Sequence, residues 1–181
     1  MVDLTGINGW FNFSDYYDSV IERLTDGSRI LEIGVFEGRS TIYLADKIRA
    51  SGKKIELHCC DLFEENQIYK GDFCGIFKEH LKRLGLESQV LIHKGFSDEV
   101  LKSFPDGFFD FIFIDGDHNY SGVIKDITLG LKKVKFGGIL AGHDADFDGV
   151  MSALKKVGFN FKLIGTVWEY APVGNWQTTF A

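Results

Sequence analysis

The stretch "FFDFIFIDGDHNYSGVIKDI", residues 108–127, contains an almost continuous apolar run that passes through a short polar turn into a helical pattern. An alternating strand exposes one face to water, whereas a continuous apolar run is typical of a strand that is buried on both faces. Such strands belong to parallel sheets, in which helices connect consecutive strands. The stretch therefore predicts one strand and its crossover helix in an α/β fold.

The same rhythm of strands and helices extends along the chain in both directions. Expected strands cover residues 29–35, 54–61, 89–95, 108–115 and 137–144, and expected helices cover residues 39–50, 77–85, 97–104, 120–134 and 148–158. Ser97 is of a residue type that caps helix N-termini. After Phe159 the sequence is strand-like, and "PVG" at residues 172–174 predicts the turn of a closing antiparallel hairpin. These elements predict a doubly wound, mostly parallel sheet with helices on both faces.

Composition narrows the class of protein further. The chain has 181 residues, of which 45% are hydrophobic, and this suits a single domain with a buried core. The formal net charge of -6 argues against a nucleic acid as the main partner, and no run of about 18 apolar residues predicts a membrane span. Cys59, Cys60 and Cys74 form no CxxC pair and are expected to be buried thiols in a reducing compartment. We therefore expect a soluble, cytoplasmic protein without nucleic-acid or membrane partners.

Unusual polar residues and glycines gather where the expected strands end. They are Gly34, Asp61, Gly95, Ser97, Asp115, His143 and Asp144. In open α/β sheets, ligands bind outside the carboxyl ends of the strands. Carboxylates and imidazoles beside buried strands cost free energy unless they are paired. The strand ends therefore predict a ligand site at one edge of the sheet.

The loop after the first expected strand indicates the class of ligand. The segment "LEIGVFEGRS", residues 31–40, lacks the GxGxxG dinucleotide fingerprint because Phe36 stands in place of the second glycine. Glu37 near the helix N-terminus would repel a phosphate, so a cofactor with a cationic end, such as S-adenosylmethionine, suits this loop better. Asp61 ends the second strand, where an acid can accept hydrogen bonds from both ribose hydroxyls. The simpler alternatives are Gly34 as a plain turn and Asp61 as a cap or a solvated strand end.

Four segments of the chain resemble class I S-adenosylmethionine-dependent methyltransferases. They are "GWFNFSDYYDSVIERL" (9–24), "ILEIGVFEGRSTIYLA" (30–45), "FIFIDGDHNYSGVIKDI" (111–127) and "GGILAGHDADFDGVMSAL" (137–154). They are most similar to the methyltransferase-24-like branch, relatives of macrolide-sugar and cephalosporin-type O-methyltransferases, and the resemblance covers residues 9–160. It implies one domain over residues 1–181, with a helical segment (1–27), a Rossmann-like core (28–181) and strand order 3-2-1-4-5-7-6. The cofactor-binding residues expected on this basis are Glu32, Gly34, Gly38, Ser40, Asp61, Leu62, Gly95, Phe96, Ser97 and Asp115.

Acidic residues and a histidine end the fourth and fifth expected strands. Neighbouring strands lie about 4.8 Å apart, so Asp115 can converge with His143 and Asp144. Three such ligands on a divalent cation would leave open coordination positions for water and a substrate hydroxyl, as a catalytic cation needs. In the sugar O-methyltransferases that the chain resembles, acidic residues at these places hold magnesium, whereas imidazole suits manganese, iron or zinc better. We expect Asp115, His143 and Asp144 as ligands of Mg²⁺ or Mn²⁺; the alternative is His143 as a base or an oriented hydrogen-bond donor.

His118 follows Asp115 by three residues and is the candidate general base, with Asp115 beside it as the second candidate catalytic residue. In methyl transfer an acceptor hydroxyl attacks the sulfonium methyl and must lose its proton, which a histidine can accept near neutral pH. The resemblance implies the same role, because the related sugar methyltransferases carry a histidine at this spacing. The alternative is a loop histidine that caps the following helix.

We therefore predict an S-adenosylmethionine-dependent enzyme that methylates a small-molecule or sugar hydroxyl. Two alternatives stay open: a non-catalytic module that binds the nucleoside, and a nicotinamide-dependent oxidoreductase, which the missing second glycine disfavours. Trp10 and Phe13 are expected to pack in the core. No cap domain is evident in the sequence, so the acceptor pocket is expected to be shallow or completed by a second subunit of a homo-oligomer.

Overall fold

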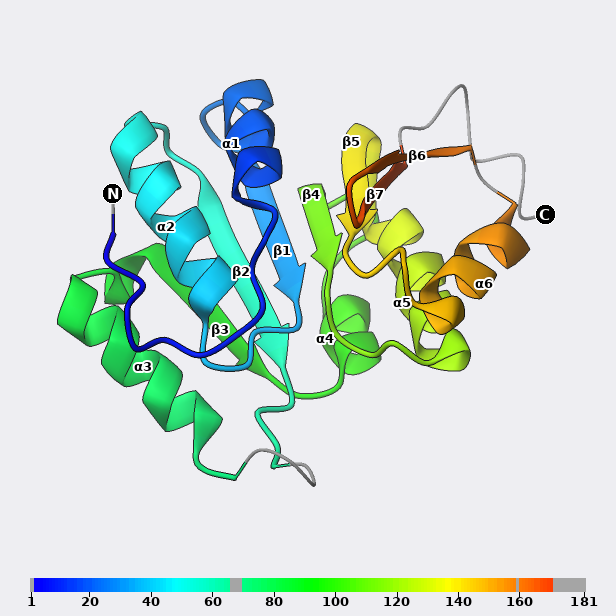
Figure 1. Cartoon of the computed structure of the whole chain (residues 1–181). Helices are drawn as coiled ribbons and strands as arrows, with labels where there is room; N and C mark the ends of the chain where they lie inside the picture. Colours follow the sequence, from blue (N-terminus) through cyan, green and yellow to red (C-terminus); the bar gives the residue numbers. More distant parts are fainter. Residues whose placement is uncertain (1, 66–69, 159, 171–181) are drawn as a thin grey trace.

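Apolar strand segments assemble one central sheet in the computed structural model, which describes residues 2–65, 70–158 and 160–170. The strands are β1 (Arg29–Ile33), β2 (Glu56–Asp61), β3 (Val90–Lys94), β4 (Phe109–Ile114), β5 (Val134–Gly142), β6 (Phe161–Ile164) and β7 (Val167–Tyr170). Their order is β3-β2-β1-β4-β5-β7-β6, with β1 to β5 parallel and β7 antiparallel to both of its neighbours (Figure 1). The predicted fold class and strand order are confirmed.

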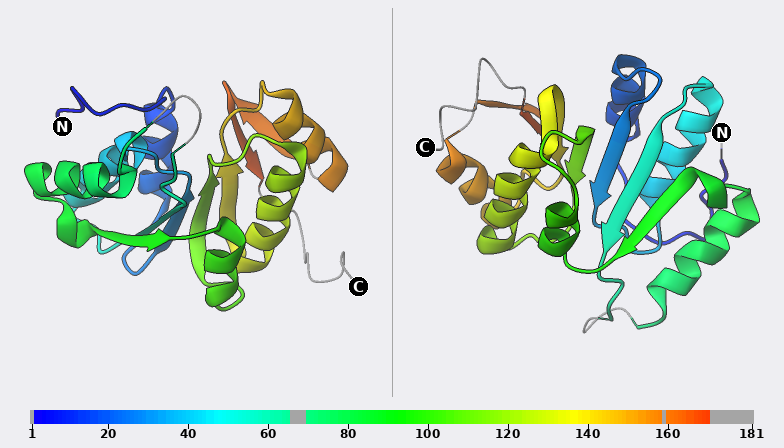
Figure 2. Two further views of the ribbon diagram at one scale, coloured as in Figure 1. Left: turned by 90° about the horizontal axis from the view of Figure 1, so that it is seen from below. Right: turned by 180° about the vertical axis from the view of Figure 1, so that it is seen from behind.

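Helices cover both faces of this sheet, as the alternation of side chains along its strands requires. They are α1 (Ser14–Arg23), α2 (Arg39–Ser51), α3 (Phe73–Leu84), α4 (Ser97–Ser103), α5 (Tyr120–Lys133) and α6 (Asp148–Val157), with a 3-10 turn η1 (Glu87–Gln89). Ile30 and Phe113 pack in a core with α1, α2 and α3, whereas Leu31 and Ile114 pack in a second core with α4, α5 and α6 (Figure 2). No helix in the described part of the chain is long and apolar enough to cross a membrane.

The closing hairpin forms earlier in the chain than expected. β6 and β7 pair in antiparallel register around a turn at Gly165 and Thr166. The turn expected at residues 172–174 lies outside the described residues. A glycine with φ of +62° at position 165 suits a tight hairpin turn, and this is the feature that the sequence reading overlooked.

Ser97 does not cap α4, so this expectation was wrong. The N-cap position is occupied by Phe96, and Ser97 is the first residue inside the helix. Its hydroxyl donates a hydrogen bond of 2.5 Å to Asp126 Oδ1 on α5. The serine therefore joins two helices at the carboxyl edge of the sheet.

Two glycines after β1 allow close approaches between elements. Gly34 has φ of +94°, and a Cβ there would lie 2.0 Å from the carbonyl oxygen of Asp115. Gly38 has φ of +87°, and a Cβ there would lie 2.0 Å from the ring of Phe77 on α3. Side chains are excluded at both positions by conformation and by space. The ends of β1 and β4 can therefore meet at the site described next.

Candidate functional site

A cavity of about 770 Å³ opens at the carboxyl ends of β1 to β4. The expected cofactor-binding residues that line it are Gly34, Ser40, Asp61, Leu62, Gly95, Phe96, Ser97 and Asp115, and the candidate base His118 lines it as well. Glu32 and Gly38, which were expected at the cofactor, are not among its lining residues. The carboxyl edge thus brings residues from four separate strand ends to one cavity.

Glu32 lies beneath the cavity and is fully buried. Its Oε1 accepts a hydrogen bond from the Tyr17 hydroxyl at 2.8 Å, and its Oε2 accepts one from Thr41 Oγ1 at 2.5 Å. Burial raises the pKa of Glu32 to about 7, although hydrogen bonds from Ser40, Thr41 and Tyr17 oppose the shift. The carboxyl group therefore joins α1, β1 and α2 below the floor of the site.

Asp61 holds the loop between β1 and α2 in place. Its Oδ2 accepts hydrogen bonds from the backbone amides of Val35 and Phe36, at 2.6 and 2.9 Å. Its Oδ1 accepts one from the amide of Phe63 at 2.6 Å. Each carboxylate oxygen can accept more than one hydrogen bond, so a side chain that fixes this loop can also receive a ligand hydroxyl. Asp61 binds loop amides and caps no described helix, since the N-cap of α2 is Gly38, and Asp61 also lines the cavity.

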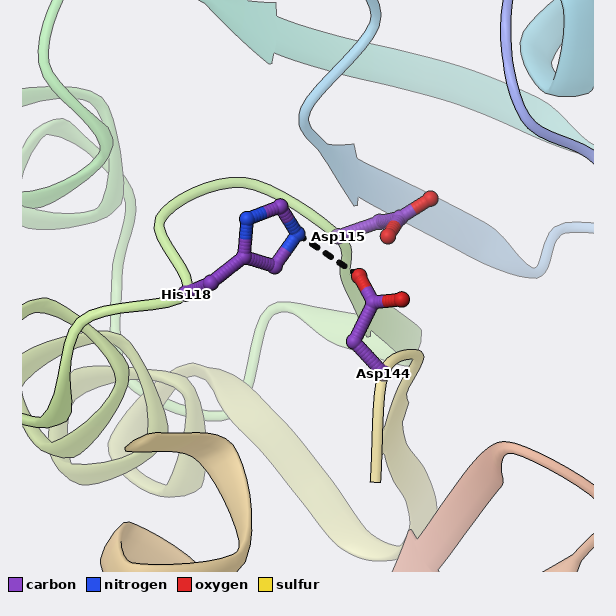
Figure 3. Close-up of side chains that lie close together, drawn as sticks. All are labelled: Asp115, His118 and Asp144. Carbon is purple, nitrogen blue, oxygen red and sulfur yellow. Dashed lines mark ion pairs between the residues drawn. The ribbon is translucent and has the colours of Figure 1, made fainter. Parts of the chain in front are cut away.

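His118, which lines the cavity, forms an ion pair with Asp144 (Figure 3). His118 Nε2 lies 2.7 Å from Asp144 Oδ2, and the hydrogen bond that His118 donates to Asp144 raises the pKa of His118. The imidazole stacks on Phe147 with ring centroids 5.0 Å apart, and its side chain is 47% exposed. Burial opposes the ionisation of Asp144, but hydrogen bonds from His118 and His143 hold the pKa of Asp144 below its ordinary value. Asp144 therefore orients the imidazole of His118 at the cavity, where the ring is open to solvent and to a ligand.

His143 faces inward instead of toward the cavity. Its Nδ1 lies 2.9 Å from Asp144 Oδ1 and 3.5 Å from Asp115 Oδ1. Its Nε2 lies 2.9 Å from Asn12 Oδ1 and 2.8 Å from Thr166 Oγ1. Burial disfavours the imidazolium, yet the hydrogen bonds that His143 donates to Asp115 and Asp144 raise the pKa of His143 to about 9. Both ring nitrogens have protein partners, so the geometry fits the alternative role of an oriented hydrogen-bond donor.

The candidate cation ligands differ from the expected set by one residue. Asp115, His118 and Asp144 each offer one ligand atom, and these atoms lie within 4.8 Å of one another (Figure 3). Burial raises the pKa of Asp115 to about 6, against the hydrogen bond from His143. His118 takes the place expected for His143 because Asn12 and Thr166 engage the ring of His143 on its far side.

Trp10 lines the cavity and does not pack in the core, so that expectation was wrong. Its side chain is 81% exposed, whereas Phe13 is 4% exposed and packs as expected. The N-terminal segment that leads to Trp10 (dark blue in Figure 1) runs across the carboxyl edge of the sheet, beside the start of α2. Arg39 donates hydrogen bonds to the carbonyl oxygens of Leu4 and Ile7, at 3.1 and 2.6 Å, which fixes this segment over the site.

Asp126 is a cavity residue that the sequence reading missed. It lies on α5, is 3% exposed, and accepts the hydrogen bond from Ser97. The sequence could have indicated its burial, because Asp126 falls within the buried stripe of α5 that includes Val123, Ile127 and Gly130. A carboxylate on the apolar face of a helix needs a partner or a ligand.

Comparisons with known proteins agree with this geometry. The family described as "Methyltransferase domain" (Methyltransf_24) matches residues 31–145. The "Uncharacterized protein R132" of Acanthamoeba polyphaga mimivirus is 32% identical over 140 residues, which are 73% of this chain and 60% of that protein. A catechol O-methyltransferase of Mycobacterium tuberculosis is 28% identical over 141 residues, 72% of this chain and 60% of that enzyme. A catechol O-methyltransferase of Niastella koreensis is 31% identical over 101 residues, 54% of this chain and 41% of that enzyme.

The chain spans between 41% and 60% of the length of these curated relatives. Among solved structures, the O-methyltransferase from Bacillus cereus in complex with SAH superposes with a TM-score of 0.68 at 16% identity, covering 93% of this chain and 84% of that one. The O-methyltransferase TomG from Streptomyces achromogenes, in complex with SAM, gives a TM-score of 0.66 at 20% identity, covering 92% and 82%. These structures show a shared fold. The chain thus belongs to the methyltransferase-domain family and has its Rossmann-like, seven-stranded fold.

Proposed function

We propose that this chain is an S-adenosylmethionine-dependent O-methyltransferase that acts on a small-molecule or sugar hydroxyl. The observation that carries the proposal is that His118, paired with Asp144, lines the same cavity as Asp61. Two of the similar structures are complexes with SAM or SAH, which supports the choice of cofactor.

The cavity offers a matching group for each part of the cofactor. Asp61 accepts hydrogen bonds from the ribose hydroxyls, and Ser40, at the start of α2, meets the methionine carboxylate at the positive end of a helix. Asp115 and Asp117 place negative charge near the sulfonium and ammonium groups. An acidic cavity of this kind favours the cationic methyl donor over a dinucleotide with its pyrophosphate.

His118 acts as the general base in this proposal. Its Nε2–H donates to Asp144, which leaves Nδ1 free to accept the proton of the acceptor hydroxyl. The acceptor oxygen forms a bond to the methyl carbon while the carbon–sulfur bond breaks, and the sulfur leaves as a neutral thioether. No acid is needed for the leaving group, so one base is sufficient.

The curated relatives suggest where the search for the acceptor begins. Two of them are named catechol O-methyltransferases, so a 1,2-dihydroxyarene heads the panel of acceptors, followed by sugars with adjacent hydroxyls. Trp10 is 81% exposed at the cavity and offers a flat apolar surface to either ring. A second subunit that completes this open side would make the active form a homo-oligomer.

A divalent cation is a second candidate for the group that activates the acceptor. Two carboxylates and one imidazole with ligand atoms within 4.8 Å fit a first-row cation, and this donor set suits Mn²⁺ better than Mg²⁺. Asp115, His118 and Asp144 would hold it, and the cation would lower the pKa of the acceptor hydroxyl. A histidine that ligates a cation cannot also accept the proton, so the two roles of His118 exclude each other.

Isothermal titration tests the cofactor first. We expect S-adenosylmethionine and S-adenosylhomocysteine to bind one site and NADH not to bind. Failure of both sulfur compounds to bind would refute the proposal, and quenching of tryptophan fluorescence by NADH alone would favour an oxidoreductase. Binding of the cofactor without methyl transfer to any acceptor in the panel would favour a non-catalytic binding module.

The cation is tested on the same preparation. Methyl transfer is measured with EDTA and then with added Mn²⁺ or Mg²⁺, for the natural protein and for Asp146→Asn, which alters an exposed acid outside the candidate ligand set. Activity that is unchanged by EDTA supports His118 as the base. Activity that requires a cation in both proteins supports the cation as the group that activates the acceptor.

A further inference from the structure

Residues 8–10, here called the N-terminal flap, form part of the wall of the cavity. Asn8, Gly9 and Trp10 line the cavity, and all three are exposed to solvent. The flap lies between Ile7, which is buried, and Phe11, which packs against the core formed with α1, α2 and α3. Its two ends are therefore anchored, while its three residues stand over the site on the dark blue segment of Figure 1.

One carboxylate holds the flap in this position. Glu37, in the loop between β1 and α2, accepts a hydrogen bond from the backbone amide of Asn8 at 2.9 Å and one from the side-chain amide of Asn8 at 3.0 Å. Glu37 is 7% exposed, so both hydrogen bonds reach a carboxylate that is largely shielded from water. If the flap moved away, this buried carboxylate would need another donor.

A second donor for Glu37 stands on α3. His80 Nε2 lies 4.0 Å from Glu37 Oε2, which is too far for a hydrogen bond. This nitrogen is the only buried side-chain nitrogen or oxygen atom without a hydrogen-bond partner among the residues that the structure describes. Buried polar atoms in folded proteins nearly always have a partner, so the nitrogen requires an explanation. A movement of about 1 Å would bring the two groups to hydrogen-bond distance.

We propose that Glu37 is a two-position latch that controls the passage of ligands into and out of the cavity. With the flap closed, Glu37 accepts from Asn8 and His80 Nε2 stays unpaired. With the flap open, water hydrates Asn8 and His80 Nε2–H donates to Glu37. Because one donor replaces the other, the two arrangements lie close in free energy, as a reversible gate requires. Gly9, with φ of +137°, lies within the flap and can absorb the change in backbone conformation.

The rates of ligand exchange test the latch, and the use of S-adenosylhomocysteine as the probe rests on the proposed cofactor. Stopped-flow mixing measures its association and dissociation rate constants through tryptophan fluorescence, since Trp10 lies on the flap. When a ligand passes only through the open flap, both rate constants scale with the open fraction. A change in the latch therefore moves both rate constants together and leaves the dissociation constant within about 2-fold.

Two variants should shift the rates in opposite directions. His80→Phe removes the donor of the open arrangement and should slow both association and dissociation by about 5-fold or more. Asn8→Ala removes one donor of the closed arrangement and should accelerate both by about the same factor. Glu79→Gln is the matched control, because Glu79 is exposed and neighbours His80 on α3, and it should change neither rate.

The pattern of rates separates the latch from simpler roles. If Asn8→Ala changes only the dissociation rate, Asn8 contacts the ligand directly. If His80→Phe leaves the rates unchanged or accelerates them, His80 only supports the fold. Either result overturns the latch.

Failure of the natural protein to bind S-adenosylhomocysteine would refute the proposed cofactor, which is a different outcome. The latch is then tested without a ligand by hydrogen exchange of the backbone amide of Asn8, which Glu37 protects in the closed arrangement. Exchange should be about 5-fold slower in His80→Phe than in the natural protein. An unchanged exchange rate would overturn the latch.

Discussion

At the scale of single residues, the chemistry of His118 depends on Asp144. The carboxylate fixes which imidazole nitrogen carries the proton, and it raises the pKa of His118. Asp144 in turn has φ of +58°, a conformation that directs its side chain toward both histidines, and asparagine tolerates it well. The same carboxylate also accepts from His143, whose ring is fixed by Asn12 and Thr166.

Asp144→Asn should therefore lower kcat by about 10- to 100-fold while the dissociation constant of the cofactor stays within about 2-fold, because an amide orients the imidazole less well and stabilises the imidazolium less. Steady-state kinetics with saturating acceptor measure kcat, and titration of S-adenosylhomocysteine measures the dissociation constant. Asp146→Asn, two residues away and exposed, should change neither. Equal loss of turnover and cofactor affinity in Asp144→Asn would contradict the assigned role.

At the scale of elements, the site exists because the ends of β1 and β4 approach each other. The close contact between Gly34 and the carbonyl oxygen of Asp115 brings the loop after β1 against the residues that follow β4. The atoms nearest to a Cβ at position 34 are backbone atoms of Asp115 and Gly116, so no flexible side chain can move to make room for it. The register of Ile33 with Ile114 fixes this arrangement.

Gly34→Ala should lower the free energy of unfolding by about 3 kcal/mol or more, because an added Cβ combines an unfavourable φ with a backbone clash. Gly52→Ala is the matched control, since Gly52 has φ of +70° but no atom within 4 Å of the position of a Cβ. It should cost about 1 kcal/mol from conformation alone. Urea denaturation of both variants measures the difference, and equal losses would show that the contact with Asp115 does not constrain the fold.

The elements could largely be predicted from the sequence, whereas part of the site could not. Continuous apolar runs indicated β1 to β5 because burial on both faces leaves a local pattern. The orientation of His143 depends on Asn12, 131 positions away, so no local pattern reports it. Trp10 was placed in the core because an aromatic residue near other aromatics favours burial, but the segment held by Arg39 places it at the cavity.

At the scale of the whole molecule, buried acids make the stability of the fold depend on pH. The folded state holds the proton of Asp126 up to a pKa of about 6, whereas the unfolded chain releases it near the ordinary value of 3.8. The unfolded state therefore binds fewer protons between these values, and this group reduces stability as pH rises from about 4 to about 6. The penalty is fully present above pH 6.

Asp126→Asn should remove that penalty. The free energy of unfolding of the variant minus that of the natural protein should rise between about pH 4 and 6 and level off above, reaching a value on the order of 2–3 kcal/mol. Urea denaturation at several pH values checks the profile. A difference that does not change with pH would show that Asp126 is not buried in its ionised form at the cavity wall.

The measurement that tests the central claim most directly is a single-turnover assay with methyl-labelled S-adenosylmethionine and a 1,2-dihydroxyarene. The natural protein and His118→Ala are compared at equal cofactor occupancy. Label should appear on one hydroxyl oxygen with the natural protein, and His118→Ala should transfer it about 100-fold more slowly or worse, because the acceptor proton has lost its base. Transfer at the natural rate by His118→Ala would contradict the assignment of His118 as the general base.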